Sequence, residues 1–206
     1  TVLGASEVIA EARWLEDLEF EYIAAGEHFM RGKPPGVTHA SLPLLAVAAG
    51  ATEKIRLLTS ILLTPFYHPL MLAKLTTTLD IASSGRLTLG IGVGGEFPAE
   101  YQAAGIDVKN RGRITNECLY LLRKLWSGAP VTYQSKFFDL ENVSINPPAY
   151  QTPNPPIWVA GRRDAAMKRA VKHGDGWLPY FYSPERYADS VNKIKLIADD
   201  ESKSLD

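Results

Sequence analysis

Apolar and polar positions are arranged along the chain in two different patterns. Residues Ser6–Leu18 carry an apolar side chain every three or four positions, which predicts an amphipathic helix with Ser6 as its N-cap. Residues Ile55–Leu63 (IRLLTSILL) are almost continuously apolar, as expected for a strand that is covered on both faces. The same two patterns predict the remaining elements. Further helices are expected at Leu42–Ala51, Pro69–Ala82, Asn110–Trp126, Asp164–Lys172 and Pro184–Ala198, and further strands at Phe20–Ala25, Arg86–Gly92, Ile157–Ala160 and Gly176–Pro179.

Strands that alternate with helices indicate βαβ units and a parallel sheet. Residues 130–156 interrupt the alternation. There VTYQ (131–134) and KFFDL (136–140) predict a small hairpin, and a Pro-rich crossing follows it. No shift in composition divides the chain, so one domain over residues 1–206 is expected. An open doubly wound sheet and a closed (β/α) barrel both fit this pattern. Either architecture binds its ligand beyond the carboxyl ends of the strands, which is where site residues are sought.

The composition is that of a globular chain with enough apolar material for one core, since 46% of the 206 residues are hydrophobic and 22% are charged. A net charge of −1 argues against binding to nucleic acid or to an anionic membrane surface. No apolar run approaches the roughly 20 residues that span a bilayer, and a cytoplasmic location is expected. The single cysteine, Cys118, excludes an internal disulfide, and its leucine-rich helix favours a packed thiol over a nucleophile. No metal site is predicted.

Polar side chains lie directly after one predicted strand and within another. His28 stands beside Glu27 directly after the first strand, where an imidazole next to a carboxylate can exchange protons near neutral pH. Alternatively, His28 only satisfies a carbonyl of its own loop. Thr59 and Ser60 place two hydroxyls in an otherwise apolar strand. They hydrogen-bond either a ligand or neighbouring backbone, because an unpaired buried hydroxyl costs roughly 1–3 kcal/mol.

A glycine-rich turn, Gly90–Glu96 (GIGVGGE), follows the strand that ends near Gly92. It formally matches the G-x-G-x-x-G pattern of a Rossmann phosphate loop, which requires an acidic residue after a second strand about 20 residues further on. That distance falls on Glu117, inside the predicted helix Asn110–Trp126, so the Rossmann interpretation is rejected. The glycines instead let the backbone approach a flat ligand closely, with Glu96 at the rim.

Gly161 and Arg162 form a further candidate site. A strand runs into this glycine and then into a helix start, and N–H groups at a helix N-terminus beside an arginine suit a phosphate. A plain strand-to-helix turn with surface arginines explains the same residues equally well.

Taken together, these segments resemble the bacterial-luciferase-like family of flavin-dependent oxidoreductases over nearly the whole chain. Each segment is modest alone, but their order and spacing are specific. The segments that carry the resemblance are GEHF (Gly26–Phe29), YHP (Tyr67–Pro69), LDIASSGRLTLGIGVGGEFPAEY (Leu79–Tyr101), RG-R-TNE (Arg111–Glu117), LW (Leu125–Trp126), NPPAYQTPNPPIWVAG (Asn146–Gly161) and GDGW (Gly174–Trp177).

The resemblance implies a TIM-barrel fold, often homodimeric, with a flavin or deazaflavin ring at the C-terminal mouth. His28 corresponds to a catalytic residue close to the ring, and Glu96 to an acid that can donate a proton beside a deazaflavin. The position of Ser60 and Ile61 commonly forms a bulge, sometimes with a non-prolyl cis peptide, on which the ring leans. The expected cofactor-binding set is completed by Glu27, Thr59, Gly92 and Gly94 near the ring and by Gly161 and Arg162 at a phosphate.

The resemblance also sets expectations for the framework. Asp80 and Arg86 match family positions and are expected to form a structural clamp between a helix and a strand. Glu19 occupies a C′ position after the first helix, where glycine is favoured, so a small loss of stability is expected. A TIM barrel has eight strands and typically about 250 residues. Five strands are recognisable here, and the first and the last two barrel strands are expected to be absent from this sequence.

Three functions are compatible with these residues. The first is a monooxygenase that uses oxygen and reduced FMN, supplied by a separate flavin reductase, to oxidise a small organic substrate. The second is hydride transfer with coenzyme F420, which Glu96 favours. The third is a non-catalytic flavin-binding or dimer-partner protein, which the missing strands suggest.

Overall fold

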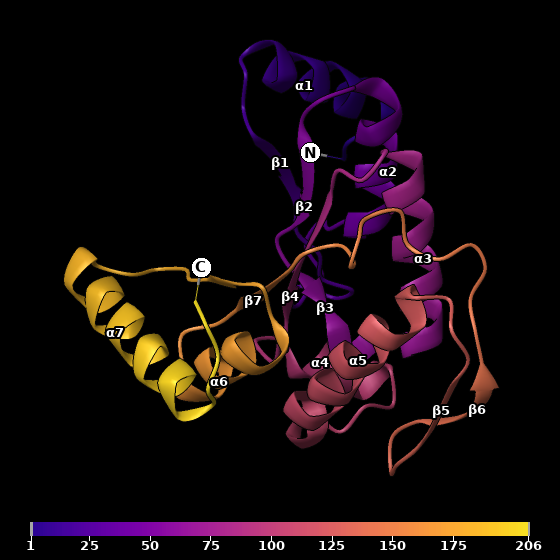
Figure 1. Cartoon of the computed structure of the whole chain (residues 1–206). Helices are drawn as coiled ribbons and strands as arrows, with labels where there is room; N and C mark the ends of the chain where they lie inside the picture. The colour runs from indigo at the N-terminus through magenta and orange to yellow at the C-terminus, as the bar shows by residue number, and fades with distance from the viewer. Residues whose placement is uncertain (1, 206) are drawn as a thin grey trace.

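The computed structural model describes residues 2–205, which form one parallel sheet with helices packed along it (Figure 1). All pairings within this sheet are parallel, and its order is β1-β2-β4-β7-β8, with β3 also paired to β4. The strands are β1 (Tyr22–Ala25), β2 (Arg56–Thr59), β3 (Leu62–Leu63), β4 (Leu87–Gly92), β7 (Ile157–Ala160) and β8 (Gly176–Leu178).

The strand order follows the chain order, and this decides between the two architectures that the sequence pattern leaves open. A doubly wound sheet reverses its order at a switch point, whereas the βα units of a barrel add each strand beside the previous one. The sheet shows no such reversal within residues 2–205, where β1 and β8 lie at its two edges. The arrangement is therefore that of part of a barrel, whose sheet is open between β1 and β8 in the described residues, with the carboxyl ends of all these strands on one side.

The helices follow one another around the sheet from α1 to α7, and the β5–β6 hairpin projects away from it (Figure 1). None of the helices described is both long and apolar enough to cross a membrane. The α-helices are α1 (Ala5–Asp17), α2 (Ser41–Ala51), α3 (Pro69–Ala82), α4 (Pro98–Ala103), α5 (Arg111–Trp126), α6 (Asp164–His173) and α7 (Pro184–Asp200), and the hairpin consists of β5 (Val131–Gln134) and β6 (Asp139–Val143).

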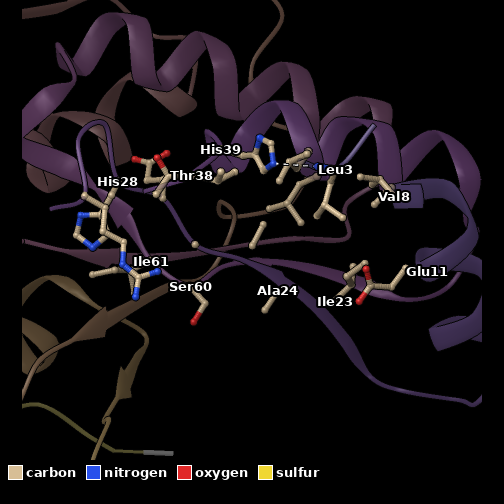
Figure 2. A pocket seen from close by; sticks show the side chains of 18 residues that line it. Leu3, Val8, Glu11, Ile23, Ala24, His28, Thr38, His39, Ser60 and Ile61 are labelled. Atoms are coloured by element: carbon tan, nitrogen blue, oxygen red, sulfur yellow. Dashed lines mark hydrogen bonds between the residues drawn. The ribbon is translucent and has the colours of Figure 1, made fainter. Parts of the chain in front are cut away.

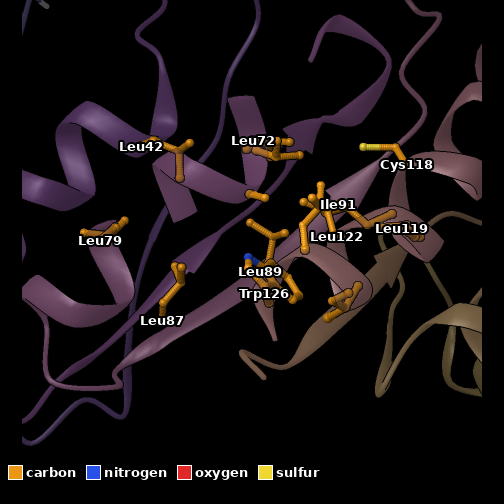
Figure 3. Close-up of a cluster of buried hydrophobic side chains, with 14 of the residues drawn as sticks. Leu42, Leu72, Leu79, Leu87, Leu89, Ile91, Cys118, Leu119, Leu122 and Trp126 are labelled. Atoms are coloured by element: carbon orange, nitrogen blue, oxygen red, sulfur yellow. The ribbon is translucent and has the colours of Figure 1, made fainter. Parts of the chain in front are cut away.

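β4 supplies the centre of the core, since all six of its residues are buried. Its Leu89 and Ile91 belong to one apolar cluster with Leu72 of α3 and Trp126 of α5 (Figure 3). Burial of each such side chain contributes about 1.5–3 kcal/mol, so this cluster holds the helices against the strand. Cys118 is fully buried in the same cluster, and burial raises the pKa of its thiol, as expected for a packed cysteine.

Two predictions at the N-terminal half were wrong in detail. Ser6 is not the N-cap of α1, because the helix begins one residue earlier and Gly4 is the N-cap, without a side-chain hydrogen bond. The predicted strand Ile55–Leu63 divides into β2 and β3, since the backbone leaves the ladder at Ser60 and Ile61.

The second hairpin strand and one helix also differ from the prediction. The strand expected at residues 136–140 begins later, because the hydroxyl of Ser135 accepts hydrogen bonds from the N–H groups of Phe137 and Phe138 and closes the turn there. Helix α4 was not expected, since six residues are too few to show helical periodicity.

Asp80 and Arg86 are structural, as expected, but they secure different segments and do not form one clamp. Asp80 is fully buried and accepts hydrogen bonds from the backbone N–H groups of Tyr150 and Gln151, both at 2.9 Å. The guanidinium of Arg86 donates to the backbone carbonyls of Ala49, Thr52, Ile55 and Ser83.

Glu19 follows α1 with φ of 60°, which is the left-handed conformation of a C′ residue.

Candidate active site

The loop after β1 places His28 between two carboxylates. Its Nδ1 lies 3.3 Å from Oε1 of Glu100, and its Nε2 lies 3.8 Å from Oε2 of Glu96. The ring of Phe97 meets the imidazole edge-on, with 4.9 Å between the ring centroids. The side chains of Glu100, His28 and Glu96 are 0%, 21% and 59% exposed, so the imidazole joins a buried carboxylate to one that reaches solvent. An imidazole held between two carboxylates is placed for acid–base chemistry.

Glu100 lies in α4 and was not among the site residues expected from the sequence. Its Oε2 accepts hydrogen bonds from the backbone N–H groups of Phe29 at 3.1 Å and Met30 at 3.3 Å. One signal in the sequence points to it: Pro98 favours a helix start at this position, two residues before Glu100.

Glu27 belongs to the framework of the site. Its buried carboxylate accepts hydrogen bonds from Leu63 N–H at 2.9 Å, from the N–H and hydroxyl of Ser41 at 3.2 and 3.0 Å, and from the hydroxyl of Tyr67 at 3.1 Å. Burial, together with this carboxylate, raises the pKa of Tyr67. Both oxygens of Glu27 thus face donors of the protein, and its contact with a cofactor stays a prediction.

The end of β2 combines one buried hydroxyl with a bulge. Thr59 is fully buried and donates to the carbonyl of Gly90 at 2.6 Å, which is the backbone partner of the alternative interpretation. Ser60 is exposed, and the Ser60–Ile61 peptide is cis, as the resemblance implies. A Cβ on Gly92 would lie 1.9 Å from Cδ1 of Ile61. Glycine therefore allows β4 to pass directly against the bulge.

The glycine-rich turn is held in place by α4. Gly94 has a left-handed φ of 58°, and a Cβ there would lie 2.7 Å from the hydroxyl of Tyr101. That hydroxyl donates to the carbonyl of Val93, and burial raises the pKa of Tyr101. The turn that carries Glu96 is thus anchored to the helix that carries Glu100.

Gly161 and Arg162 border the same mouth. The Arg162 guanidinium lies over the ring of Tyr180, 4.6 Å from its centroid, and the Tyr180 hydroxyl donates to Oε1 of Glu96 at 3.4 Å. Gly161 has φ of 141° between β7 and α6. The first turn of α6 already carries the carboxylate of Asp164. The two turns that the sequence singles out therefore meet through Tyr180.

A cavity of about 490 Å³ runs along β1 beneath α1 and α2 (Figure 2). His28, Ser60 and Ile61 line one end of it, whereas Leu3 and Val8 line the other. Glu27 also lines the cavity, whereas Thr59 and the predicted residues of the glycine-rich turn and of the turn after β7 are not among its lining residues. Among residues 2–205, no group of three or more His, Cys, Asp or Glu side chains is arranged to hold a metal ion.

Residues 3–206 match the luciferase-like monooxygenase family. This chain belongs to that family. The resemblance read from the motifs is thereby confirmed. The oxygenase component of the flavin-dependent trigonelline monooxygenase of Acinetobacter baylyi is 34% identical over 155 residues, which are 74% of this chain and 42% of that protein.

Solved structures of the same fold match as well. Monooxygenase RslO1 from Streptomyces bottropensis has a TM-score of 0.86 at 28% identity, covering 97% of this chain and 61% of its own. The coenzyme F420 dependent tetrahydromethanopterin reductase from Methanopyrus kandleri has a TM-score of 0.84 at 22% identity, covering 98% and 60%, which shows likeness of fold alone. The chain thus spans about 60% of these two structures and 38–63% of the curated relatives that it matches. Over that part, the expected TIM-barrel fold class is confirmed.

Proposed function

We propose that this protein is a flavin-dependent oxidoreductase of the monooxygenase type, which uses reduced FMN and oxygen to oxidise a small organic substrate. The observation that carries the proposal is the position of His28, which lies between Glu100 and Glu96 and lines a cavity end together with the Ser60–Ile61 bulge. The name of the A. baylyi relative, a flavin-dependent monooxygenase, supports the same chemistry.

The residues at the mouth fit a flat ring. Gly92 carries no side chain where β4 meets the bulge, and any Cβ there would collide with Ile61. Glycine there lets the bulge pack directly against β4, and the Ser60–Ile61 bulge lines the cavity end at which an aromatic ring system would lie. Bound there, a reduced flavin supplies the electrons that activate oxygen.

In this proposal His28 is the catalytic acid–base group. Its Nε2 points toward the exposed carboxylate of Glu96, so a proton taken up at this nitrogen can pass to Glu96 and from there to solvent. The edge-on ring of Phe97 restricts the rotation of the imidazole. His28 therefore presents one nitrogen in a defined direction.

We assign the phosphate of the cofactor to the turn of Gly161 and Arg162. The Arg162 guanidinium rests on the ring of Tyr180 and forms no ion pair with the described residues, so its charge is available to an anion. The Asp164 carboxylate opposes an anion at the start of α6 itself. The guanidinium, not the helix dipole, is therefore the expected contact.

A second candidate keeps the fold and transfers a hydride with coenzyme F420, without oxygen. Glu96 favours it, because its carboxyl group is 59% exposed and 3.8 Å from the imidazole, where it can donate a proton beside a ring at the mouth.

Two protein partners belong to the proposal. A separate flavin reductase would supply reduced FMN, as suggested by a relative that is named an oxygenase component. A second copy of the chain would cover the outer face of α3, where Met71 and Leu75 are 59% and 46% exposed and one helical turn apart. Leu75→Glu should then convert a dimer into a monomer in light-scattering measurements, whereas a monomeric wild type would contradict the homodimer.

The cofactor is tested by anaerobic titration of the purified protein with FMN, reduced FMN and coenzyme F420, followed by fluorescence and ultrafiltration. Preference for reduced FMN supports the monooxygenase, and preference for F420 supports the second candidate. Tight flavin binding without turnover of any substrate would favour a non-catalytic flavin-binding protein. Binding of none of the three would contradict all of these functions.

The phosphate assignment has its own test. Arg162→Ala should weaken FMN binding by roughly 10–100-fold, as expected for one lost charge-assisted hydrogen bond of about 1.5–3 kcal/mol, and should leave riboflavin binding unchanged. Arg163→Ala is the matched control, since Arg163 is the exposed neighbouring arginine. Equal loss of FMN and riboflavin affinity in the Arg162 variant would contradict the assignment.

A further inference from the structure

We propose that Glu100 is a positioning residue that selects the tautomer of His28, holding a hydrogen on Nδ1 and leaving the Nε2 lone pair free toward the mouth. The catalytic consequence rests on the function proposed above. The positioning itself rests only on the contacts of Glu100.

The two oxygens of Glu100 have different partners. Oε2 accepts from the backbone N–H groups of Phe29 and Met30, at 3.1 and 3.3 Å, while Oε1 faces Nδ1 of His28 at 3.3 Å. The side chain is fully buried, so water does not compete for these oxygens. An ionised carboxylate only accepts hydrogen bonds, and therefore the nitrogen that faces it carries the hydrogen.

The protonation state of the other ring nitrogen follows from this arrangement. A neutral imidazole has a single N–H, so a hydrogen on Nδ1 leaves Nε2 as an acceptor. Nε2 lies 3.8 Å from Oε2 of Glu96, on the side that reaches solvent. A proton that moves from a bound ligand to Nε2 makes the ring an imidazolium, whose charge Glu100 stabilises. The same proton then leaves through Glu96, and His28 returns to its starting form.

The contacts of Glu100 also explain how one carboxylate can orient both the imidazole of His28 and the backbone next to it. Phe29 and Met30 directly follow His28, so the group that faces the imidazole also fixes the backbone next to it. Phe97 limits the ring from a further side. If Glu100 only fastened the loop, the tautomer of His28 would not depend on the charge of Glu100. This difference makes the two roles separable.

The test is the tautomer of His28, measured by long-range ¹H–¹⁵N NMR spectra of protein labelled in its histidines, at a pH where the ring is neutral. The spectrum of His28→Gln assigns the signals. In the wild type, Nδ1 is expected to be the protonated nitrogen. In Glu100→Gln, the amide oxygen can keep the bonds from Phe29 and Met30 while the NH₂ group donates to Nδ1, so the hydrogen should move to Nε2. Glu96→Gln is the matched control and should leave the hydrogen on Nδ1.

Two results would overturn the proposal: a hydrogen on Nε2 in the wild type, or an unchanged tautomer in folded Glu100→Gln. The wild-type spectrum decides even if the Glu100 variant does not fold. Flavin titration of the same samples separates this proposal from the proposed function. A tautomer switch in a protein that binds no flavin would refute the function and keep the role of Glu100, whereas flavin binding without a switch would do the reverse.

Discussion

Replacing Glu27 by alanine should destabilise the fold strongly. The carboxylate accepts four hydrogen bonds, which come from the N–H and hydroxyl of Ser41, the N–H of Leu63 and the hydroxyl of Tyr67. The hydroxyls can turn to other partners, but the two backbone N–H groups cannot. A buried N–H without a partner costs about 1–3 kcal/mol, so Glu27→Ala should lower the free energy of unfolding by about 2–6 kcal/mol. That is a large share of the 5–15 kcal/mol that is roughly typical of a domain.

Two milder variants separate the contributions of the individual hydrogen bonds of Glu27 to the free energy of unfolding. In Glu27→Gln the amide oxygen can replace Oε2, which takes three of the four bonds, while the NH₂ group is left facing the N–H of Leu63. One unpaired donor predicts a loss of about 1–3 kcal/mol. Tyr67→Phe removes one hydroxyl without leaving a backbone group unpaired and should cost about 1 kcal/mol.

Urea unfolding at neutral pH, followed by tryptophan fluorescence and circular dichroism, measures these free energies. The alanine variant is expected to be the least stable of the three. FMN affinity is measured on the same samples. If both Glu27 variants lose less than about 1 kcal/mol and bind FMN poorly, Glu27 contacts the cofactor, and the framework role argued from its hydrogen bonds is refuted.

Other changes have equally definite expected outcomes. Glu19→Gly relieves a left-handed residue after α1 and should raise the unfolding free energy by about 0.5–1 kcal/mol in the same assay, whereas a loss would contradict the capping argument. Gly92→Ala forces a Cβ onto Ile61 and should cost about 1–3 kcal/mol in urea and weaken flavin binding; unchanged affinity would place the ring elsewhere. Burial, followed by neighbouring cations, lowers the pKa of His173 from 6.5 to about 4. Unfolding exposes it to protonation, so stability is lost as the pH falls from about 6.5 to about 4, by at most about 3 kcal/mol. His173→Asn should flatten that part of the stability–pH curve, and identical curves for the two proteins would contradict it.

The sequence by itself determined the secondary structure where an element is long enough for the periodicity of its apolar positions to be recognised. The nearly continuous apolar run Ile55–Leu63 and the amphipathic face of α5 predict which of their own residues are buried, because burial of a face is a property of consecutive residues. The motifs also placed His28, Gly92 and the Ser60–Ile61 bulge at strand ends, and sequential strand ends of a parallel sheet share one edge. By contrast, α4 and the start of β6 escaped prediction, since short elements depend on turns and caps more than on periodicity.

Only the tertiary structure decided what each polar side chain faces. Glu100 meets the imidazole of His28 across 72 positions of sequence, and no local pattern encodes a distance between residues that far apart. Glu27 and Thr59 both hydrogen-bond the protein, because distant segments that pack against them bring buried donors or carbonyls that must be satisfied. Residue types at a strand end therefore indicate where chemistry can occur. Which of them reaches the ligand is set by the direction of each side chain, and that direction follows from the packing of distant segments.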